Sequence, residues 1–362
     1  MNDDTASNAS NRLANVIGTG LIGGSIALAL KERGWHVSGT DNNPQRIEDA
    51  LSLGVIDEVG INPQAAVSFI ATPVGQIPEA AREALTQTAG VVSDVGSVKL
   101  SVMEQVNNPR FVGGHPMAGS EHEGVKGATS DLFEGAVWVL TPMSETDPDD
   151  FTLVRSLVAS FGAEVVEVTP DRHDYLVAVV SHVPHLTAAT LMTLASMRSE
   201  EHPGLLRLAA GGFRDMTRVA SGHPGIWPDI CETNRPAIVT VLDEMITGLS
   251  RVRAVVDNSD RAGLYRFLDT ARSARDSLPS RSVRPGELAE IRVPILDRPG
   301  ELSGITTLAT DLDVNIYDIE IDHSAERARG LLVLVVAQAM SERFIGGLMA
   351  RGYRPVSRPL DK

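Results

Sequence analysis

One histidine in a glycine-rich segment has the chemistry and the surroundings of a proton acceptor. His115 lies in the segment 113–121, GGHPMAGSE, between glycines and a proline. These neighbours predict a constrained loop rather than a helix or a strand. Imidazole titrates near neutral pH, so a histidine held in such a loop can take the proton of an alcohol whose carbon gives up hydride.

A second glycine-rich segment has the spacing of a dinucleotide-binding turn. Gly18, Gly20 and Gly23 form the pattern Gly-x-Gly-x-x-Gly between a predicted strand at 13–17 and a predicted helix at 21–33. The first glycine permits the turn, the second lets a pyrophosphate approach, and the third allows the helix to pack on the strand. The helix N-terminus would face the phosphates. The residues expected at the cofactor in this turn are Gly18, Gly20, Leu21, Ile22 and Gly23.

An acidic residue after the second predicted strand favours NAD as the cofactor. Asp41 lies about 20 residues beyond the glycines, where a carboxylate binds the ribose 2′-hydroxyl and repels a 2′-phosphate. Arg46 is the nearby cation that could instead accommodate NADP.

Two further loops follow predicted strands of the same region. Thr72 and Pro73 form either a wall of the cofactor site or an ordinary turn at the end of a strand. Ser97 follows the next strand, where it could cap the helix after it and could also hold a hydroxyl beside His115, since the two roles are compatible.

Strands and helices alternate over the first half of the chain. This order is typical of an α/β fold with a Rossmann-type, doubly wound parallel sheet. The predicted strands are residues 13–17, 35–39, 66–71, 90–92, 111–112, 137–140 and 163–168, and the predicted helices are 21–33, 77–85, 98–106 and 151–161.

The pattern changes twice in the second half. Residues 171–277 have helical periodicity with almost no strand signal, and the helix at 182–185 is expected to bend at Pro184. In the tail, strands at 291–296, 314–321 and 331–336 and helices at 301–312 and 341–351 give a βαββα order, with a possible last strand near Pro355, as in a ferredoxin-like unit. The predicted organisation is a disordered tail at 1–12, a Rossmann domain at 13–169, an all-α domain at 170–278, a linker at 279–287 and a small α+β domain at 288–362.

Composition excludes several classes of partner. The net charge of −15 argues against nucleic acid and anionic membranes, which need a basic surface. The longest apolar run, residues 331–337, is too short to span a bilayer. Cys231 is the only cysteine, so no intramolecular disulfide can form and the cytoplasm is the expected compartment.

A zinc site is the other chemistry that the histidines could perform. His182 and His185 are three residues apart, and His173 lies upstream. Such spacing can hold a metal, but no cysteine is near and hydride transfer needs none, so no metal is expected.

Several motifs together resemble the prephenate dehydrogenase family of tyrosine biosynthesis. The resemblance covers residues 13 to about 250. Ordered motifs over this length are more specific than any one of them. They are Gly18-x-Gly20-x-x-Gly23-Gly24-Ser25, Asp94-x-Gly96-Ser97-x-Lys99, Gly114-His115-Pro116-Met117-Ala118-Gly119, His173-Asp174, Ser181-His182-x-Pro184-His185, Gly212-Phe213-Arg214-Asp215-Met216-Thr217-Arg218, Trp227 and Asn234-Arg235.

The resemblance implies NAD-dependent oxidation of the C4 alcohol of prephenate with loss of CO₂, giving 4-hydroxyphenylpyruvate. His115 would then take the hydroxyl proton, and Ser97 would help to hold the hydroxyl and the imidazole. Arg218 would grip a substrate carboxylate, although a salt bridge with Asp215 one helical turn away would also explain it. Trp227 could close the pocket or could belong to the core. Further residues expected at the substrate are His185, Ser120, Glu121 and Asp215.

The tail resembles the opening of an ACT domain, a small module that binds amino acids. The resemblance lies in the segment 296–302, LDRPGEL, and implies a regulatory site for tyrosine at Asp297, Pro299 and Gly300. A module that only dimerises, or has lost its ligand, would look the same. The family also implies a homodimer, the commonest closed assembly.

Three other functions are alternatives to prephenate dehydrogenase. Arogenate dehydrogenase acts on the amino analogue of prephenate and often prefers NADP. The β-hydroxyacid dehydrogenases rely on a lysine in their helical domain, whereas this chain has no lysine between Lys126 and Lys362. A non-catalytic sensor of nucleotide and amino acid would not need Ser97, His115 and Arg218 together.

Overall fold

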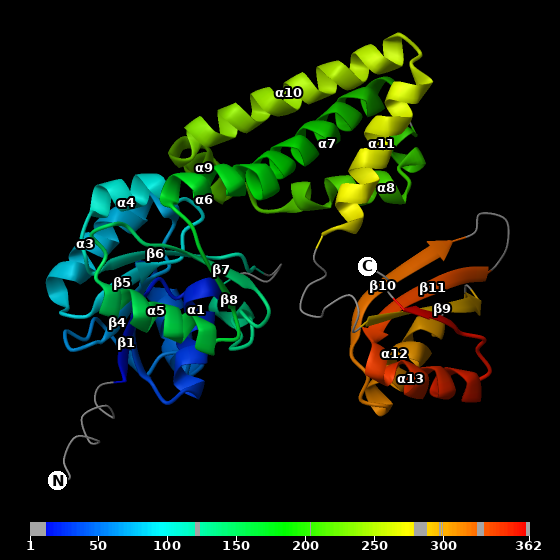
Figure 1. Cartoon of the computed structure of the whole chain (residues 1–362). Helices are drawn as coiled ribbons and strands as arrows, with labels where there is room; N and C mark the ends of the chain where they lie inside the picture. The colour runs from blue at the N-terminus through cyan, green and yellow to red at the C-terminus, as the bar shows by residue number, and fades with distance from the viewer. Residues whose placement is uncertain are drawn as a thin grey trace. The chain divides into compact units, whose positions relative to one another are not determined.

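The chain forms two compact units, one ending at Asp260 and one beginning at Arg261 (Figure 1). A computed structural model describes residues 12–119, 124–202, 204–278, 288–296, 298, 300–323 and 329–359. The predicted tail, apart from Arg12, and the predicted linker at 279–287 lie outside these residues.

The first unit begins with an eight-stranded sheet in the order β3-β2-β1-β4-β5-β6-β7-β8. Every neighbouring pair is parallel except β6 and β7. The order reverses between β1 and β4, the switch point at which such sheets bind ligands. The strands are β1 (Leu13–Ile17), β2 (His36–Thr40), β3 (Glu58–Val59), β4 (Val67–Ile70), β5 (Val91–Asp94), β6 (Phe111–Pro116), β7 (Val137–Thr141) and β8 (Glu164–Glu167).

The pairing of β6 with β7 corrects two predictions. The sheet is not wholly parallel, because β7 runs antiparallel to β6 and pairs His115 with Val139. His115 therefore lies on a strand and not in a loop. The glycines before it serve packing rather than a turn, since a Cβ on Gly114 would lie only 2.7 Å from the Asp94 carbonyl oxygen of β5.

Helices cover both faces of the sheet, as a doubly wound fold requires. Val91 and Val92 belong to different apolar cores because successive strand residues point to opposite faces. One core includes residues of α1 and α5, and the other includes residues of α3 and α4. The helices are α1 (Leu21–Glu32), α2 (Pro44–Ser52), α3 (Ile77–Gln87), α4 (Leu100–Val106) and α5 (Pro148–Ser160).

The rest of the first unit is helical, as predicted. A continuous helical stretch consists of α6 (Pro170–Val177), a π-helical turn η3 (Ala178–His182) and α7 (Val183–Glu201). Pro184 lies in the first turn of α7, where its missing N–H costs little, and the irregular turn comes before it. The other helices are α8 (Gly211–Thr217), α9 (Trp227–Thr233) and α10 (Arg235–Asp257), with short 3₁₀ turns at Leu205–Leu208, Arg218–Ser221 and Pro224–Ile226.

The stretch Pro170–Glu201 is long and apolar enough to cross a membrane, by length and composition only. Only 28% of its most apolar window is buried within the chain. A single helix of this kind is weak evidence for a membrane span, because helices that pack against a partner have the same composition.

The second unit contains α11 (Arg261–Asp276) and a four-stranded antiparallel sheet in the order β10-β11-β9-β12. Its core joins strand residues such as Ile291 and Leu332 to Ile305 and Phe344 of two helices. The predicted last strand near Pro355 is present and pairs with β9. The elements are β9 (Leu288–Leu296), α12 (Glu301–Asp311), β10 (Ile316–His323), β11 (Arg329–Ala337), α13 (Gln338–Ala350) and β12 (Val356–Pro359).

Candidate functional site

A cavity of about 330 Å³ lies where the ends of β5 and β6 meet the helical part of the first unit. It brings together three residues that the sequence singled out, Ser97, His115 and Trp227. The residues that line it are Ser97, His115, Pro116, Met117, Ala118, Ser181, His182, Ile226, Trp227 and Ile230.

A chain of hydrogen bonds leads from His115 to a carboxylate. His115 is buried, and its Nδ1 lies 2.9 Å from Nε2 of His173. His173 Nδ1 in turn lies 2.8 Å from Oδ1 of Asp174. Both His173 and Asp174 are buried, so the chain is shielded from water.

The carboxylate end of this chain fixes where the protons are. Asp174 also accepts hydrogen bonds from the backbone N–H groups of Lys99 (2.7 Å) and Leu100 (2.9 Å), so both of its oxygens act as acceptors. His173 must then carry its proton on Nδ1 and accept on Nε2. His115 must donate from Nδ1, which leaves its Nε2, on the side away from His173, as an acceptor that has no hydrogen-bond partner among the described residues.

Asp174 takes the capping role that was predicted for Ser97. Helix α4 begins at Leu100, and its first N–H groups are satisfied by Asp174 rather than by a serine hydroxyl. Capping by Ser97 is therefore wrong, because a carboxylate from another helix takes that place. The Ser97 side chain lines the cavity instead.

A buried ion pair holds the strands around the cavity. Lys99 and Asp94 are both fully buried and their side chains pair directly. Asp94 also accepts hydrogen bonds from the backbone N–H groups of Gly96 (2.8 Å) and Gly114 (3.1 Å). One carboxylate thus connects the end of β5, the loop that carries Ser97 and the strand that carries His115.

The surroundings keep His115 uncharged. Burial is the largest cause, and the neighbouring His173, Lys99 and His182 add to it, so the pKa of His115 lies well below its usual value. Burial likewise lowers the pKa of Lys99, while Asp94 opposes that shift. A neutral imidazole with a free Nε2 is the form that can take a proton.

A second cavity, of about 160 Å³, lies at the switch point of the sheet. The backbone of Gly18 has φ +97°, and a Cβ there would meet the backbone of Ala71. Gly20 has no heavy atom of the described chain within 4 Å of the position of a Cβ, so its outer face is open. The residues that line this cavity are Ile17, Gly18, Gly20, Thr40, Asp41, Asn42, Arg46, Ala71, Thr72, Pro73 and Gln76.

The residues around the second cavity have the features of a dinucleotide-binding turn. The Asp41 carboxylate accepts from the backbone N–H groups of Thr19 and Asn43, both at 2.9 Å, which holds it at the cavity wall. The Thr72 hydroxyl is buried and has no hydrogen-bond partner in the described part of the chain. Leu21 and Ile22 begin α1, whose N-terminus has the favourable field for a pyrophosphate.

The other described residues that were predicted at the substrate do not line the first cavity. His185 stacks on Trp227, with 3.8 Å between ring centroids and 20° between planes. Arg218 and Asp215 are exposed, and no ion pair joins them among the described residues. The other predicted positions without a description are Ser120, Glu121, Asp297 and Pro299, whereas Gly300 is described and precedes α12 with φ +93°.

The sequence motifs gave no catalytic role to His173, Asp174 or the Lys99–Asp94 pair, and His173 was considered only as a possible zinc ligand. One signal was available for Lys99, which is one of only four lysines in the chain and follows a predicted buried strand. No signal of that kind pointed from His173 to His115, because the two are 58 residues apart in the sequence.

Comparison with known proteins gives consistent matches. The model of the prephenate dehydrogenase nucleotide-binding domain matches residues 26–167, and that of the prephenate dehydrogenase dimerization domain matches 169–270. The chain is 37% identical to a prephenate dehydrogenase of Bacillus subtilis over 87% of this chain and 89% of that protein.

Solved structures agree with these matches. A prephenate dehydrogenase from A. aeolicus, in complex with hydroxyphenyl propionate and NAD⁺, is 30% identical with a TM-score of 0.70, covering 74% of this chain and 99% of its own. An arogenate dehydrogenase from Synechocystis is 31% identical with a TM-score of 0.66, covering 73% and 99%.

Two glycine substitutions should separate cofactor binding from folding. Gly20→Ala should leave the free energy of unfolding unchanged but weaken NAD binding at least about tenfold, because its methyl group fills space needed by the pyrophosphate. Gly23→Ala should instead destabilise the fold by about 1–3 kcal/mol, because its Cβ would collide with the Gly18 carbonyl. Calorimetric titration and urea unfolding measure the two effects, and equal NAD affinity in Gly20→Ala and the unchanged chain would contradict this assignment.

Proposed function

We propose that this chain, which belongs to the prephenate dehydrogenase family, converts prephenate to 4-hydroxyphenylpyruvate and CO₂ with reduction of NAD. The observation that carries the proposal is the acceptor nitrogen of His115, set by Asp174 through His173 inside a cavity. The reaction needs such a base, because an alcohol gives up hydride more easily once its proton is being removed.

The bound cofactor and the residues of the cavity each have a defined role in this reaction. Bound NAD supplies the nicotinamide that accepts the hydride from C4. His115 takes the C4 hydroxyl proton on Nε2 and becomes positively charged. That charge is stabilised through the Nδ1–H bond to His173 and the Asp174 carboxylate beyond it. Loss of CO₂ leaves an aromatic ring, so this step asks little more of the protein.

Arg218 is proposed to bind a carboxylate of the substrate. Its guanidinium is exposed and forms no ion pair in the described part of the chain, so it is free to grip a carboxylate with two hydrogen bonds. Asp215 is one turn away and can orient it. His185 is proposed to act next to Trp227, on which it stacks, while Ser120 and Glu121 keep their predicted place at the substrate by resemblance alone.

Arogenate is the second candidate substrate. The chain is 31% identical to the arogenate dehydrogenase of Synechocystis and 30% identical to the prephenate dehydrogenase of A. aeolicus, and the two substrates differ only in the side chain. Arg46 lines the cofactor cavity together with Asp41 and is the residue that would admit NADP.

The tail is proposed to be an ACT-like module that binds tyrosine as a feedback regulator. The element order βαββαβ and the strand order β10-β11-β9-β12 support a ferredoxin-like unit. Gly300 and the start of α12 would receive the amino acid, together with Asp297 and Pro299.

The single Cys231 supports a reducing cytoplasm as the compartment.

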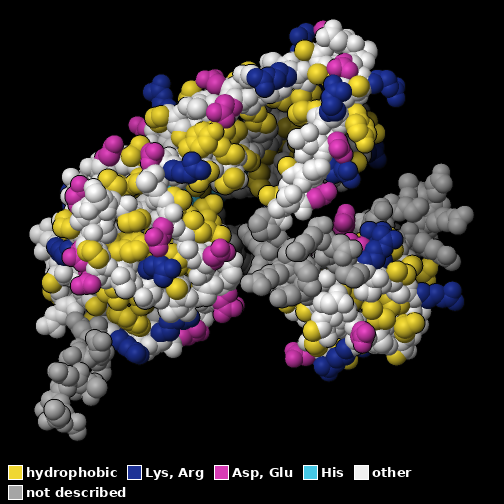
Figure 2. Space-filling view, viewed as in Figure 1, with side chains coloured by type: hydrophobic (Ala, Val, Ile, Leu, Met, Phe, Trp, Pro, Cys, Tyr) yellow, Lys and Arg dark blue, Asp and Glu magenta, His cyan; other side chains and the backbone are white. Residues whose placement is uncertain are grey.

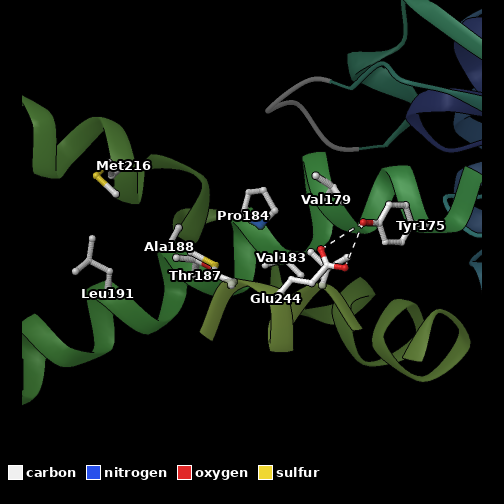
Figure 3. A pocket seen from close by; sticks show the side chains of 11 residues that line it. Tyr175, Val179, Val183, Pro184, Thr187, Ala188, Leu191, Met216 and Glu244 are labelled. Carbon is white, nitrogen blue, oxygen red and sulfur yellow. Dashed lines mark hydrogen bonds between the residues drawn. The ribbon is translucent and has the colours of Figure 1, made fainter. Parts of the chain in front are cut away.

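The chain is proposed to work as a homodimer through its helical part, which matches a dimerization domain. Large apolar side chains of α7 and α10 are exposed in the single chain, among them Leu194, Met197, Ile246 and Leu249. Figure 2 shows hydrophobic side chains gathered over this helical part. A cavity of about 600 Å³ is lined mainly by apolar side chains of α6, η3, α7, α8 and α10. Tyr175 and Glu244, which are hydrogen-bonded to each other, also line it (Figure 3). A partner subunit would cover this surface.

The reaction itself is tested by steady-state kinetics with prephenate or arogenate, NAD or NADP, and with or without tyrosine. We expect 4-hydroxyphenylpyruvate and NADH from prephenate, with inhibition or activation by tyrosine through the tail. His115→Asn should lower kcat by about 100-fold to 10,000-fold, because the base is lost, while the Kd for NAD stays the same. Full activity in His115→Asn would refute the base, and turnover of arogenate alone would move the assignment to the second candidate.

The pH profile tests the hydrogen-bond chain. Because the pKa of His115 is lowered, kcat/KM should be flat at pH 6.5 and above and fall only at lower pH, as the base becomes protonated. Asp174→Asn should lower kcat by about 100-fold or more, because the positive charge that forms on His115 is no longer stabilised. The pH below which kcat/KM falls should not rise, because the loss of a carboxylate does not favour protonation of His115.

The matched control is Asp171→Asn, on the same helix α6 but exposed, which should keep both kcat and the profile. An Asp174→Asn enzyme that melts at the normal temperature and keeps full kcat would show that the chain does not support catalysis.

The dimer is tested by light scattering after size-exclusion chromatography. The unchanged chain should be a dimer, and Ile246→Arg should shift it toward the monomer because a charge would be buried at the contact. Gln45→Arg, on the exposed face of α2, should leave the dimer intact. A monomeric unchanged chain, or one recovered only with lipid, would contradict the proposal.

A further inference from the structure

His182 is a second buried imidazole in the wall of the catalytic cavity, and the mechanism above does not use it. It ends the π-helical turn η3, is 1% exposed and lines the cavity that also contains His115 and Ser97. Its ring meets that of Trp227 edge-on, at 6.2 Å between centroids.

The hydrogen bonds of Asn234 fix the tautomer of His182. The side-chain nitrogen of Asn234 donates to the backbone carbonyl of Asp174 at 2.9 Å, which identifies it as the amide nitrogen. The same nitrogen lies 3.2 Å from Nδ1 of His182 and gives its second proton to it. Nδ1 is therefore an acceptor, and the ring proton of His182 is on Nε2.

This Nε2–H group is a buried donor without a partner among the described residues. Native proteins rarely leave such a group unsatisfied, because it has lost its water and gained nothing in exchange. Burial, the largest cause, lowers the pKa of His182 to about 4, so the ring is neutral at physiological pH and keeps this tautomer.

His115 and His182 offer complementary groups to one cavity. His115 presents an acceptor nitrogen and His182 presents a donor N–H. An alcohol needs both, since its proton must be accepted while its oxygen accepts a hydrogen bond in turn. A carboxylate would need donors only and would be repelled by the lone pair of His115.

We propose that His182 is a further catalytic residue, whose Nε2–H donates to the substrate oxygen from which His115 removes the proton. As that proton leaves, the oxygen gains negative charge, and a fixed neutral donor stabilises this charge in the transition state. The proposal rests on the proposed function, because it takes the reacting group to be an alcohol.

Two substitutions separate the donor from the structural hydrogen bond. His182→Asn places an amide near the position of Nδ1, so it can still accept from Asn234, but it removes the donor to the cavity. His182→Gln reaches further and restores an N–H near the position of Nε2. We expect kcat to fall about 10-fold to 100-fold in His182→Asn with KM nearly unchanged, and to recover largely in His182→Gln.

Binding measurements test the identity of the oxygen without turnover. In the presence of NAD⁺, 4-hydroxyphenylpropionate should bind the unchanged chain more tightly than 3-phenylpropionate, which lacks the ring hydroxyl. In His182→Asn this preference should shrink about fivefold or more, because one partner of the hydroxyl is gone. Thermal unfolding and the Kd for NAD should not change.

The possible failures are distinguishable. An unchanged preference for the hydroxyl in His182→Asn, or a rise in KM with kcat intact, would overturn the proposal for His182 while leaving the reaction in place. A chain that binds neither compound and does not turn over prephenate would refute the proposed function itself.

Discussion

The hydrogen bonds of the Asp174 carboxylate are the constraint on which the rest of the site depends. They join the helical part of the first unit to the nucleotide-binding sheet, because the N-terminus of α4 and the ring of His173 share one acceptor. An ionised carboxylate can only accept hydrogen bonds, so His173 must donate to Asp174 and must in turn accept from His115. Asp174 therefore determines, through His173, that the Nε2 of His115 is an acceptor, although Asp174 itself does not contact His115.

The buried Lys99–Asp94 pair plays the corresponding role within the sheet. The loss of hydration when two charges are buried offsets much of their attraction, so the pair adds little to the free energy of unfolding. Its role is better explained by the positions in which it holds the neighbouring groups. Asp94 holds the loop of Ser97 and the backbone of Gly114 at fixed places, and Lys99 also gives its N–H to Asp174. Cavity, strand and helix are therefore connected through two carboxylates.

Much of this organisation could be predicted from local patterns. The turn from Gly18 to Gly23, the helical stretch after residue 170 and the order of the tail follow from spacing and periodicity within short windows. The direction of β7 could not, because it depends on the close approach that Gly113 and Gly114 allow between distant strands. The short β3 and the polar α2 carry too little apolar pattern to be seen. The contact of His115 with His173 is purely tertiary, and so is the capping of α4 by Asp174.

The central claim is that Asp174, acting through His173, keeps the Nε2 of His115 free of a proton. Nitrogen-15 NMR of the enzyme with labelled histidines measures this directly, with the signal of His115 assigned by its loss in His115→Asn. The account predicts that near pH 7 the ring is neutral, with its proton on Nδ1 and none on Nε2. A proton on Nε2, or a doubly protonated ring at that pH, would contradict it.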